Sequence, residues 1–139
     1  MPLHPSQFIA LAEFRHQVRR FLHFSEQAAR ASGLEPQQHQ LLLALKGSRD
    51  AQTTIGSLAE RLQVRHNSAV ELINRMAQHG WVRRVPSRED RRRVVVKLTK
   101  SGNAVLGRLS AVHLRELRQA GPTLVTALEA LLPAAKAAG

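Results

Sequence analysis

The segment SREDRRRVVVKLTKSG, residues 87–102, carries the most specific candidate chemistry in the chain. A planar guanidinium donates several hydrogen bonds at once, which suits phosphate and guanine. Asp90 and Arg92 are two positions apart, so at an extended hairpin tip both face the same way and Asp90 can hold Arg92 in one pose. We predict that Arg92 enters a narrow minor groove of duplex DNA, where negative potential is concentrated. Arg88 and Arg91 would contact phosphates.

The alternative for this segment is a solvated hairpin tip whose charges only improve solubility. The three valines that follow the arginines favour a strand, because β-branched side chains suit a pleated, half-buried setting. The arginines are therefore predicted at a turn, and the valines in the strand that returns from it.

A second candidate contact surface lies in RHNSAVELINRMAQHG, residues 65–80. Its apolar residues recur at i, i+3, i+4 and i+7, which predicts an amphipathic helix that ends at Gly80. GSLAERLQV, just before it, predicts a shorter helix, and two short helices joined by a tight link are typical of a helix-turn-helix. Arg84 is a further candidate contact and belongs with the arginines of the hairpin, which we call the wing. The candidate DNA contacts on the second helix are Arg65, His66, Asn67, Ser68, Glu71, Asn74 and Arg75.

The remaining elements must position these two surfaces. The first long helix has two apolar stripes, one with Leu11 and Leu22 and the other with Phe14 and Phe21, which suggests packing on its own domain and on a partner chain. Gly121-Pro122 is predicted to break the C-terminal helical region. The expected order is a helix at 7–31, a helix at 36–47, a very short strand at 53–55, the two short helices, a hairpin at 81–85 and 94–98, and helices at 100–119 and 124–132.

This order predicts a mainly α (α+β) fold: a winged helix-turn-helix with long N- and C-terminal dimerisation helices. We expect one domain over residues 1–139. Its DNA-binding lobe would span about 53–98, and its helical extensions about 7–31 and 100–135.

Composition narrows the function. The 139 residues contain no cysteine, which removes disulfides and thiol chemistry, and they lack a glycine-rich phosphate loop, a paired-carboxylate cluster or a nucleophile with its base, so we do not expect an enzyme. No apolar run predicts a membrane span, and the N-terminus does not resemble a signal peptide, so the expected location is the cytoplasm. The net charge of +11 favours a polyanionic partner, with nucleic acid ahead of an anionic membrane surface or an acidic protein.

The sequence resembles the multiple antibiotic resistance regulator (MarR) family of bacterial transcription regulators. The likeness is carried by LAERLQV at 58–64, LINRMAQHGWVRR at 72–84 and DRRRVVVKLTKSG at 90–102. The last stretch is similar to the family's wing signature, which Asp90, Arg92, Leu98, Thr99 and Gly102 match. Gln63 departs from the family where glycine is common, and Arg65 where a small hydroxyl residue is common. The resemblance also implies that Arg75 can serve as structural support instead of a DNA contact.

Four histidines come from elements that meet around the ligand pocket in resembling proteins: His16, His23, His39 and His113. A metal site there is the alternative, but no pair at i, i+4 lies within one helix, so we expect no metal and no cofactor. Ordinary polar or pocket-lining histidines are the favoured interpretation. A small organic anion is the expected ligand of such a basic pocket.

The leading hypothesis is a homodimeric, sequence-specific regulator that binds double-stranded DNA, and the resemblance favours a repressor released by a small ligand. The alternative is an architectural nucleic-acid-binding protein without sequence preference. The two differ in whether the protein prefers particular sites over bulk DNA.

Overall fold

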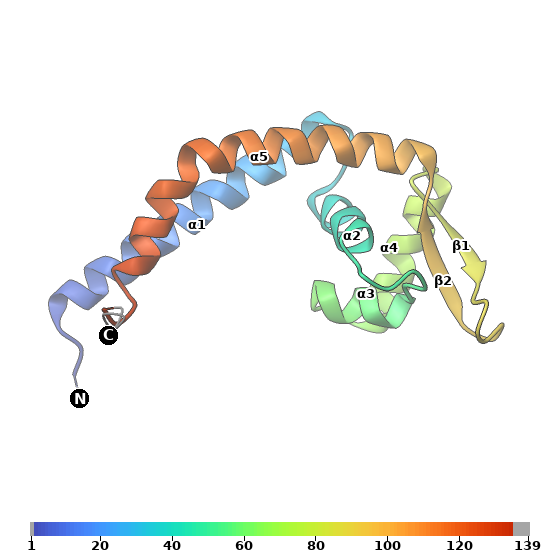
Figure 1. Ribbon diagram of the computed structural model, residues 1–139, viewed down its shortest axis with the longest axis horizontal. Coiled ribbons are helices and arrows are strands. Elements are labelled where there is room, and N and C mark those ends of the chain that lie inside the picture. Colours follow the sequence, from blue (N-terminus) through green and yellow to red (C-terminus); the bar gives the residue numbers. More distant parts are fainter. Residues whose placement is uncertain (1, 135–139) are drawn as a thin grey trace, which may run out of the picture. The chain divides into compact units, whose positions relative to one another are not determined.

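The computed structural model describes residues 2–134 of the chain (Figure 1). It divides into two compact units: residues 29–110, here called the winged-helix unit, and a helical-pair unit formed by the segments before residue 29 and after residue 110. The prediction of a mainly α winged helix-turn-helix between long terminal helices is confirmed. The elements are α1 (Pro5–Ala31), α2 (Pro36–Lys46), α3 (Ile55–Leu62), α4 (His66–Gln78), β1 (Val82–Pro86), β2 (Val94–Leu98) and α5 (Lys100–Glu129).

Helices α3 and α4 form the helix-turn-helix. Thr54 begins α3 as its N-cap, because its side-chain oxygen accepts a hydrogen bond from the backbone N–H of Ser57 at 3.2 Å. Gln63 ends α3 in the left-handed conformation, with a φ of 56°. Glycine is favoured at such a position because it has no Cβ to strain. Gln63, which stands where glycine is common in the resembling family, is therefore the residue at which the chain turns toward α4.

The wing is a two-stranded antiparallel hairpin beside α4 (Figure 1). Its register pairs Val82 with Leu98 and Pro86 with Val94. Val95 and Val96 are buried, as the run of valines predicted. The very short strand expected at 53–55 is reduced to one isolated bridge between Thr54 and Val95, because Ile55 already begins α3.

The core of the winged-helix unit is formed by side chains from every helix and strand in it. Ile73 and Met76 of α4 are fully buried, so the apolar positions read from the sequence face inward. The other fully buried large side chains of this unit are Leu34, Leu41, Leu42, Leu58, Val82, Val95, Val96, Val105 and Leu109.

A close contact at the root of the hairpin joins the end of α4 to the start of α5. Thr99 caps α5, since its Oγ1 accepts a hydrogen bond from the backbone N–H of Gly102 at 3.0 Å. The same hydroxyl lies 2.5 Å from the carbonyl oxygen of Gly80. A Cβ on Gly102 would lie 2.0 Å from the carbonyl oxygen of Trp81, so only glycine fits there.

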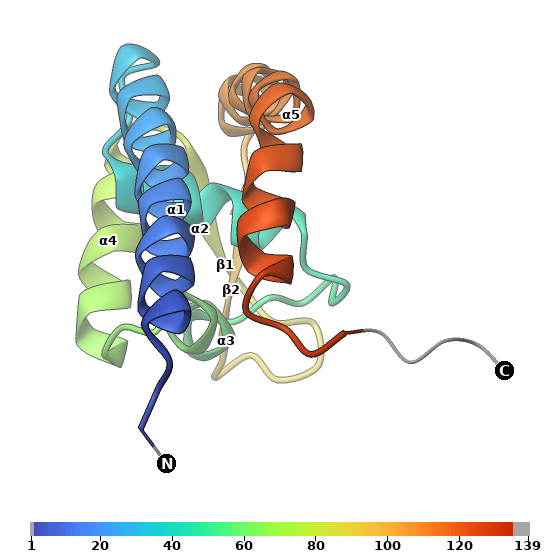
Figure 2. The same ribbon diagram turned by 90° about the vertical axis from the view of Figure 1, so that its left-hand side faces the viewer.

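In the helical-pair unit, α1 and the C-terminal part of α5 run side by side (Figures 1 and 2). The predicted break at Gly121-Pro122 is wrong: α5 continues through Pro122 to Glu129. Proline costs one backbone hydrogen bond and usually kinks a helix, but it does not force the helix to end. Residue 135, the expected end of this extension, lies outside the described residues. Across residues 2–134 no helix is long and apolar enough to cross a membrane.

The contact at Gly102 predicts a specific stability defect. Gly102→Ala should lower the free energy of unfolding by about 1–3 kcal/mol, because its methyl group overlaps the backbone of Trp81 and the chain must shift. Gly107→Ala, in the same helix with open space around it, is the control and should raise stability by up to about 1 kcal/mol. Urea unfolding at matched protein concentration measures both. Equal stabilities for the two variants would contradict the close packing.

Candidate nucleic-acid interface

Helix α4 presents a polar face to solvent. Its buried residues are Ala69, Leu72, Ile73 and Met76. The predicted contact residues of this helix and its N-cap are all exposed: Arg65, His66, Asn67, Ser68, Glu71, Asn74 and Arg75. The structure therefore brings these seven side chains to the solvent side of one helix, and its N-terminal turn is open to a ligand.

The first turn of α4 lacks the usual cap. Arg65 occupies the N-cap position and makes no side-chain capping bond. A serine or threonine there would satisfy a free N–H of the first turn. The exposed arginine instead adds positive charge beside the N-terminal end of the helix dipole, a place that favours anions. Arg75 is exposed near the other end, which leaves its alternative roles of support and DNA contact both available.

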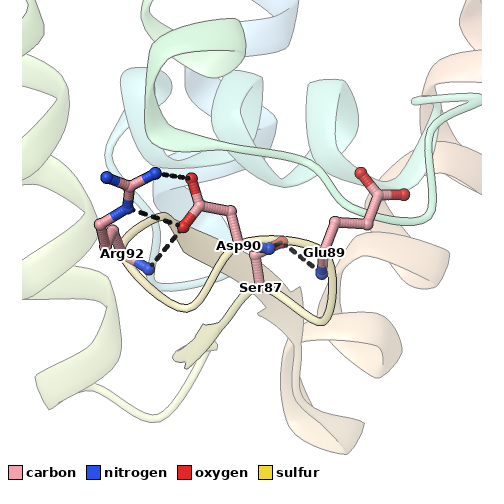
Figure 3. A network of polar contacts seen from close by, with 4 residues as sticks. All are labelled: Ser87, Glu89, Asp90 and Arg92. Atoms are coloured by element: carbon pink, nitrogen blue, oxygen red, sulfur yellow. Dashed lines mark hydrogen bonds and ion pairs between the residues drawn. The ribbon is translucent and has the colours of Figure 1, made fainter.

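The tip of the wing is held by an ion pair between Asp90 and Arg92 (Figure 3). Arg92 Nε donates to Asp90 Oδ1 at 3.1 Å, and Arg92 Nη2 donates to Asp90 Oδ2 at 3.4 Å. The backbone N–H of Arg92 also donates to Oδ1 at 3.0 Å. The side chain of Arg92 is 91% exposed and that of Asp90 35% exposed. The guanidinium is therefore held from one side while most of it faces solvent.

The predicted contact between Asp90 and Arg92 is present, but the predicted reason for it is wrong. The tip is a turn and not an extended strand: the backbone N–H of Arg93 donates to the carbonyl oxygen of Asp90 at 2.9 Å. An aspartate that accepts a backbone N–H two residues on forms a local turn of its own. The turn, and not strand alternation, brings the two side chains together.

The pKa of Asp90 is lowered below its usual value. The largest cause is the side-chain hydrogen bond from Arg92, followed by the backbone N–H of Arg92 and the positive charge of Arg93, while partial desolvation acts in the opposite direction. The carboxylate is therefore charged at neutral pH. The stability that the ionised carboxylate adds to the tip is fully present at pH values above the ordinary pKa of an aspartate. It is lost as the pH falls through the lowered pKa of Asp90.

Two residues that the sequence did not point to support the tip. Ser87 is buried, and its Oγ accepts hydrogen bonds from the backbone N–H groups of Glu89 at 3.2 Å and Asp90 at 3.3 Å (Figure 3). Gln52, from the loop before α3, accepts the backbone N–H of Arg88 at 3.2 Å. A serine just after a strand is a weak turn signal, and nothing in the spacing of Gln52, 36 residues from Arg88, could have revealed its contact.

The other arginines of the predicted wing site divide into two groups. Arg88 and Arg91 are exposed at the tip near Arg92. Arg84 lies on β1, away from the tip, and its Nη1 donates to Oδ1 of Asn74 on α4 at 2.5 Å. The structure thus places Arg84 beside α4.

The four candidate pocket histidines are divided between the two units: His16, His23 and His113 belong to the helical-pair unit and His39 to the winged-helix unit. His16 and His23 line a cavity of about 620 Å³ in the helical-pair unit, together with Arg19 and Arg20. His113 is part-buried in the same unit, with its Nε2 2.8 Å from Ser25 Oγ. It does not line this cavity, and nor does His39, which is buried on α2. Within residues 2–134 no three His, Cys, Asp or Glu side chains are grouped so that they could hold a metal ion.

The helix-turn-helix, the braced wing and the terminal helices define a winged helix-turn-helix protein. The model of the MarR family matches residues 32–93. Over this segment, which includes both helices of the helix-turn-helix, the chain is similar to the MarR family.

Two transcription regulators are similar to the chain over part of their length. The chain is 38% identical over 92 residues to the transcriptional activatory protein BadR of Rhodopseudomonas palustris, a match that covers 65% of this chain and 53% of BadR. It is 31% identical over 61 residues to the regulator PecS of Dickeya dadantii, which covers 44% of this chain and 37% of PecS. The matched parts thus span about half or less of these relatives.

Solved structures share the fold at low sequence identity. AbsC, a MarR family transcriptional regulator from Streptomyces coelicolor, has a TM-score of 0.74 and 22% identity, with 86% of this chain and 81% of AbsC covered. A mutant MarR from E. coli complexed with operator DNA has a TM-score of 0.66 and 22% identity, with 86% of this chain and 90% of that chain covered.

The bonds at the tip predict a shift in the titration of Asp90. Arg92→Ala should raise the pKa of the Asp90 carboxyl toward its ordinary value, because the largest cause of its lowering is removed. NMR titration of the carboxyl carbon measures this. Arg91→Ala, which removes an exposed neighbouring charge, is the control and should shift the pKa less. An unchanged titration in the Arg92 variant would contradict the pairing.

Proposed function

We propose that this protein is a sequence-specific, DNA-binding transcription regulator. The observation that carries the proposal is the Asp90–Arg92 pair, which holds an exposed guanidinium at the tip of a hairpin next to α4. An arginine without an orienting partner would be sufficient for non-specific electrostatic attraction to DNA. An orienting carboxylate lowers the net charge of the tip, so its presence is better explained by a contact that requires a defined pose.

The proposed binding mode uses both surfaces of the winged-helix unit. The N-terminal half of α4 enters the major groove, where His66, Asn67 and Ser68 can reach base edges. Arg92 enters an adjacent minor groove, and Arg88 and Arg91 contact phosphates on either side of it. The net charge of +11 supplies the long-range attraction that brings the protein to DNA.

Competition binding tests this function. A labelled duplex selected from genomic DNA with the wild-type protein should be displaced by the same unlabelled duplex at a concentration about a thousandfold lower than that required of bulk DNA. The measurement is made at one fixed salt concentration, because phosphate contacts make affinity depend on salt. Equal competition by selected and bulk DNA would contradict sequence specificity and favour the architectural alternative.

A homodimer is the second part of the proposal. Several large apolar side chains of the helical-pair unit are exposed, among them Leu11, Leu22, Val125 and Leu128. Within this unit's described residues only Gln17 and Ala127 are buried, so a single copy offers the pair very little core. A second copy of the chain, packed on these faces, would remove the apolar surface from water.

Charge introduced on this face should separate the copies. The double substitution Val125→Glu and Leu128→Glu should convert a dimer to a monomer in light scattering at micromolar concentration, because it would bury carboxylates without partners. Thr126→Glu adds a charge on the same helix at an exposed polar position and should leave the dimer intact. A monomeric wild-type protein would overturn this part of the proposal.

The ligand and the direction of regulation stay predictions. The cavity has the size for a small organic ligand, and its lining includes Arg19 and Arg20 as well as Glu26 and Glu116. The expected ligand is a small organic anion held by the two arginines, and a screen of organic acids for release of the DNA complex tests that expectation. Repression was expected from the sequence, whereas the relative BadR is described as an activatory protein.

A further inference from the structure

The hydrogen bond between Arg84 and Asn74 links β1 to α4. Arg84 Nη1 lies 2.5 Å from Asn74 Oδ1, and the two residues are ten positions apart in the chain. Both side chains belong to exposed residues. A bond between two solvated side chains costs rotamer freedom and adds little stability at a surface. The bond lies on the surface that we propose to face DNA, so it can serve to orient Arg84 toward the duplex.

Strand alternation explains why Arg84 reaches α4. Val82 and Arg84 are two positions apart on β1, so they share a face of the hairpin, and Val82 is buried. Val96, the partner of Arg84 on β2, is buried as well. Arg83 points to the opposite face, where its partner across the hairpin is Lys97. Arg84 and Arg83 are therefore neighbours in sequence with different surroundings.

The chemistry of the pair differs from that of the wing tip. Asp90 neutralises part of the charge of Arg92, whereas the amide of Asn74 orients Arg84 and leaves its charge whole. One N–H of the guanidinium is used, and its other donors are free for a phosphate. An asparagine that reads adenine uses both its oxygen and its amide nitrogen, and here the oxygen is already occupied by Arg84.

We propose that Arg84 and Asn74 form a phosphate clamp at the flank of α4, in which Arg84 contacts the DNA backbone and Asn74 positions it. Asn74 is then a positioning residue and not a base reader. Arg84 belongs functionally to the recognition helix and not to the wing tip. This inference rests on the proposed DNA-binding function and specifies which residues fix the register of α4 on the duplex.

A double-mutant cycle on DNA affinity tests the clamp. The proteins are wild type, Asn74→Ala, Arg84→Ala and the double variant, measured on one duplex selected with the wild type. Arg84→Ala should weaken binding about tenfold, as expected for a charge-assisted hydrogen bond, and reduce the slope of log affinity against log salt by about one. In the Arg84→Ala background, the further loss from Asn74→Ala should be less than about twofold.

Base preference distinguishes positioning from reading. Asn74→Ala should leave the relative affinities for single-base-substituted duplexes unchanged, since a phosphate contact carries no sequence information. Loss of discrimination at one base pair would show that Asn74 reads a base and would overturn the proposal. So would additive losses in the cycle.

Arg83→Ala is the matched control, because it removes the same charge from the adjacent strand position on the other face. Its effect should add to that of Asn74→Ala. Thermal melting of each variant without DNA checks that the fold is kept. If the wild-type protein does not prefer its selected duplex over bulk DNA, the proposed function fails and the clamp fails with it. If the preference is present and the cycle is additive, only the clamp is wrong.

Discussion

The close approach of Gly102 to the backbone of Trp81 is the constraint on which the winged-helix unit depends. The Oγ1 of Thr99 donates to the carbonyl of Gly80 and accepts the N–H of Gly102, and the backbone N–H of Thr99 donates to the carbonyl of Trp81 at 3.2 Å. These bonds close the root of the hairpin where α4 ends and α5 begins. These bonds fix where β1 begins relative to the end of β2, and this sets the register of the two strands. In that register Val95 and Val96 of β2 are buried in the core. The wing tip is then presented at a defined place beside α4.

Much of this arrangement could be predicted from the sequence, because it depends on local patterns. The apolar spacing of α4, the valines of β2 and the cap at Thr99 each predict their element directly. The expected break at Gly121-Pro122 was wrong, because a proline does not force a helix to end. The expected strand at 53–55 is only a bridge, because Ile55 already begins α3. The pairing of Asp90 with Arg92 was predicted through strand alternation, but a turn produces it. Contacts across long sequence separations, such as that of Gln52 with Arg88, leave no periodic signal.

The two arginines that matter most to the account are oriented by different chemical groups. Arg92 has a carboxylate partner that also accepts the backbone N–H of Arg92, and Arg84 has a neutral amide partner on α4. A charged partner fixes a guanidinium more strongly but lowers its attraction to phosphate, whereas an amide leaves that attraction intact. This difference fits the proposed roles of the two side chains, insertion into a narrow groove for Arg92 and phosphate contact for Arg84.

The central claim is that α4 and the wing contact DNA together, in the major groove and in the adjacent minor groove. Hydroxyl-radical footprinting on a selected duplex tests it most directly, since cleavage is read from the minor-groove side of each sugar. We expect two symmetric protected regions about one helical turn apart, each with an outer minor-groove protection that disappears in the Arg92→Ala variant. Outer protection that is unchanged in that variant, or uniform protection without a centre of symmetry, would contradict it.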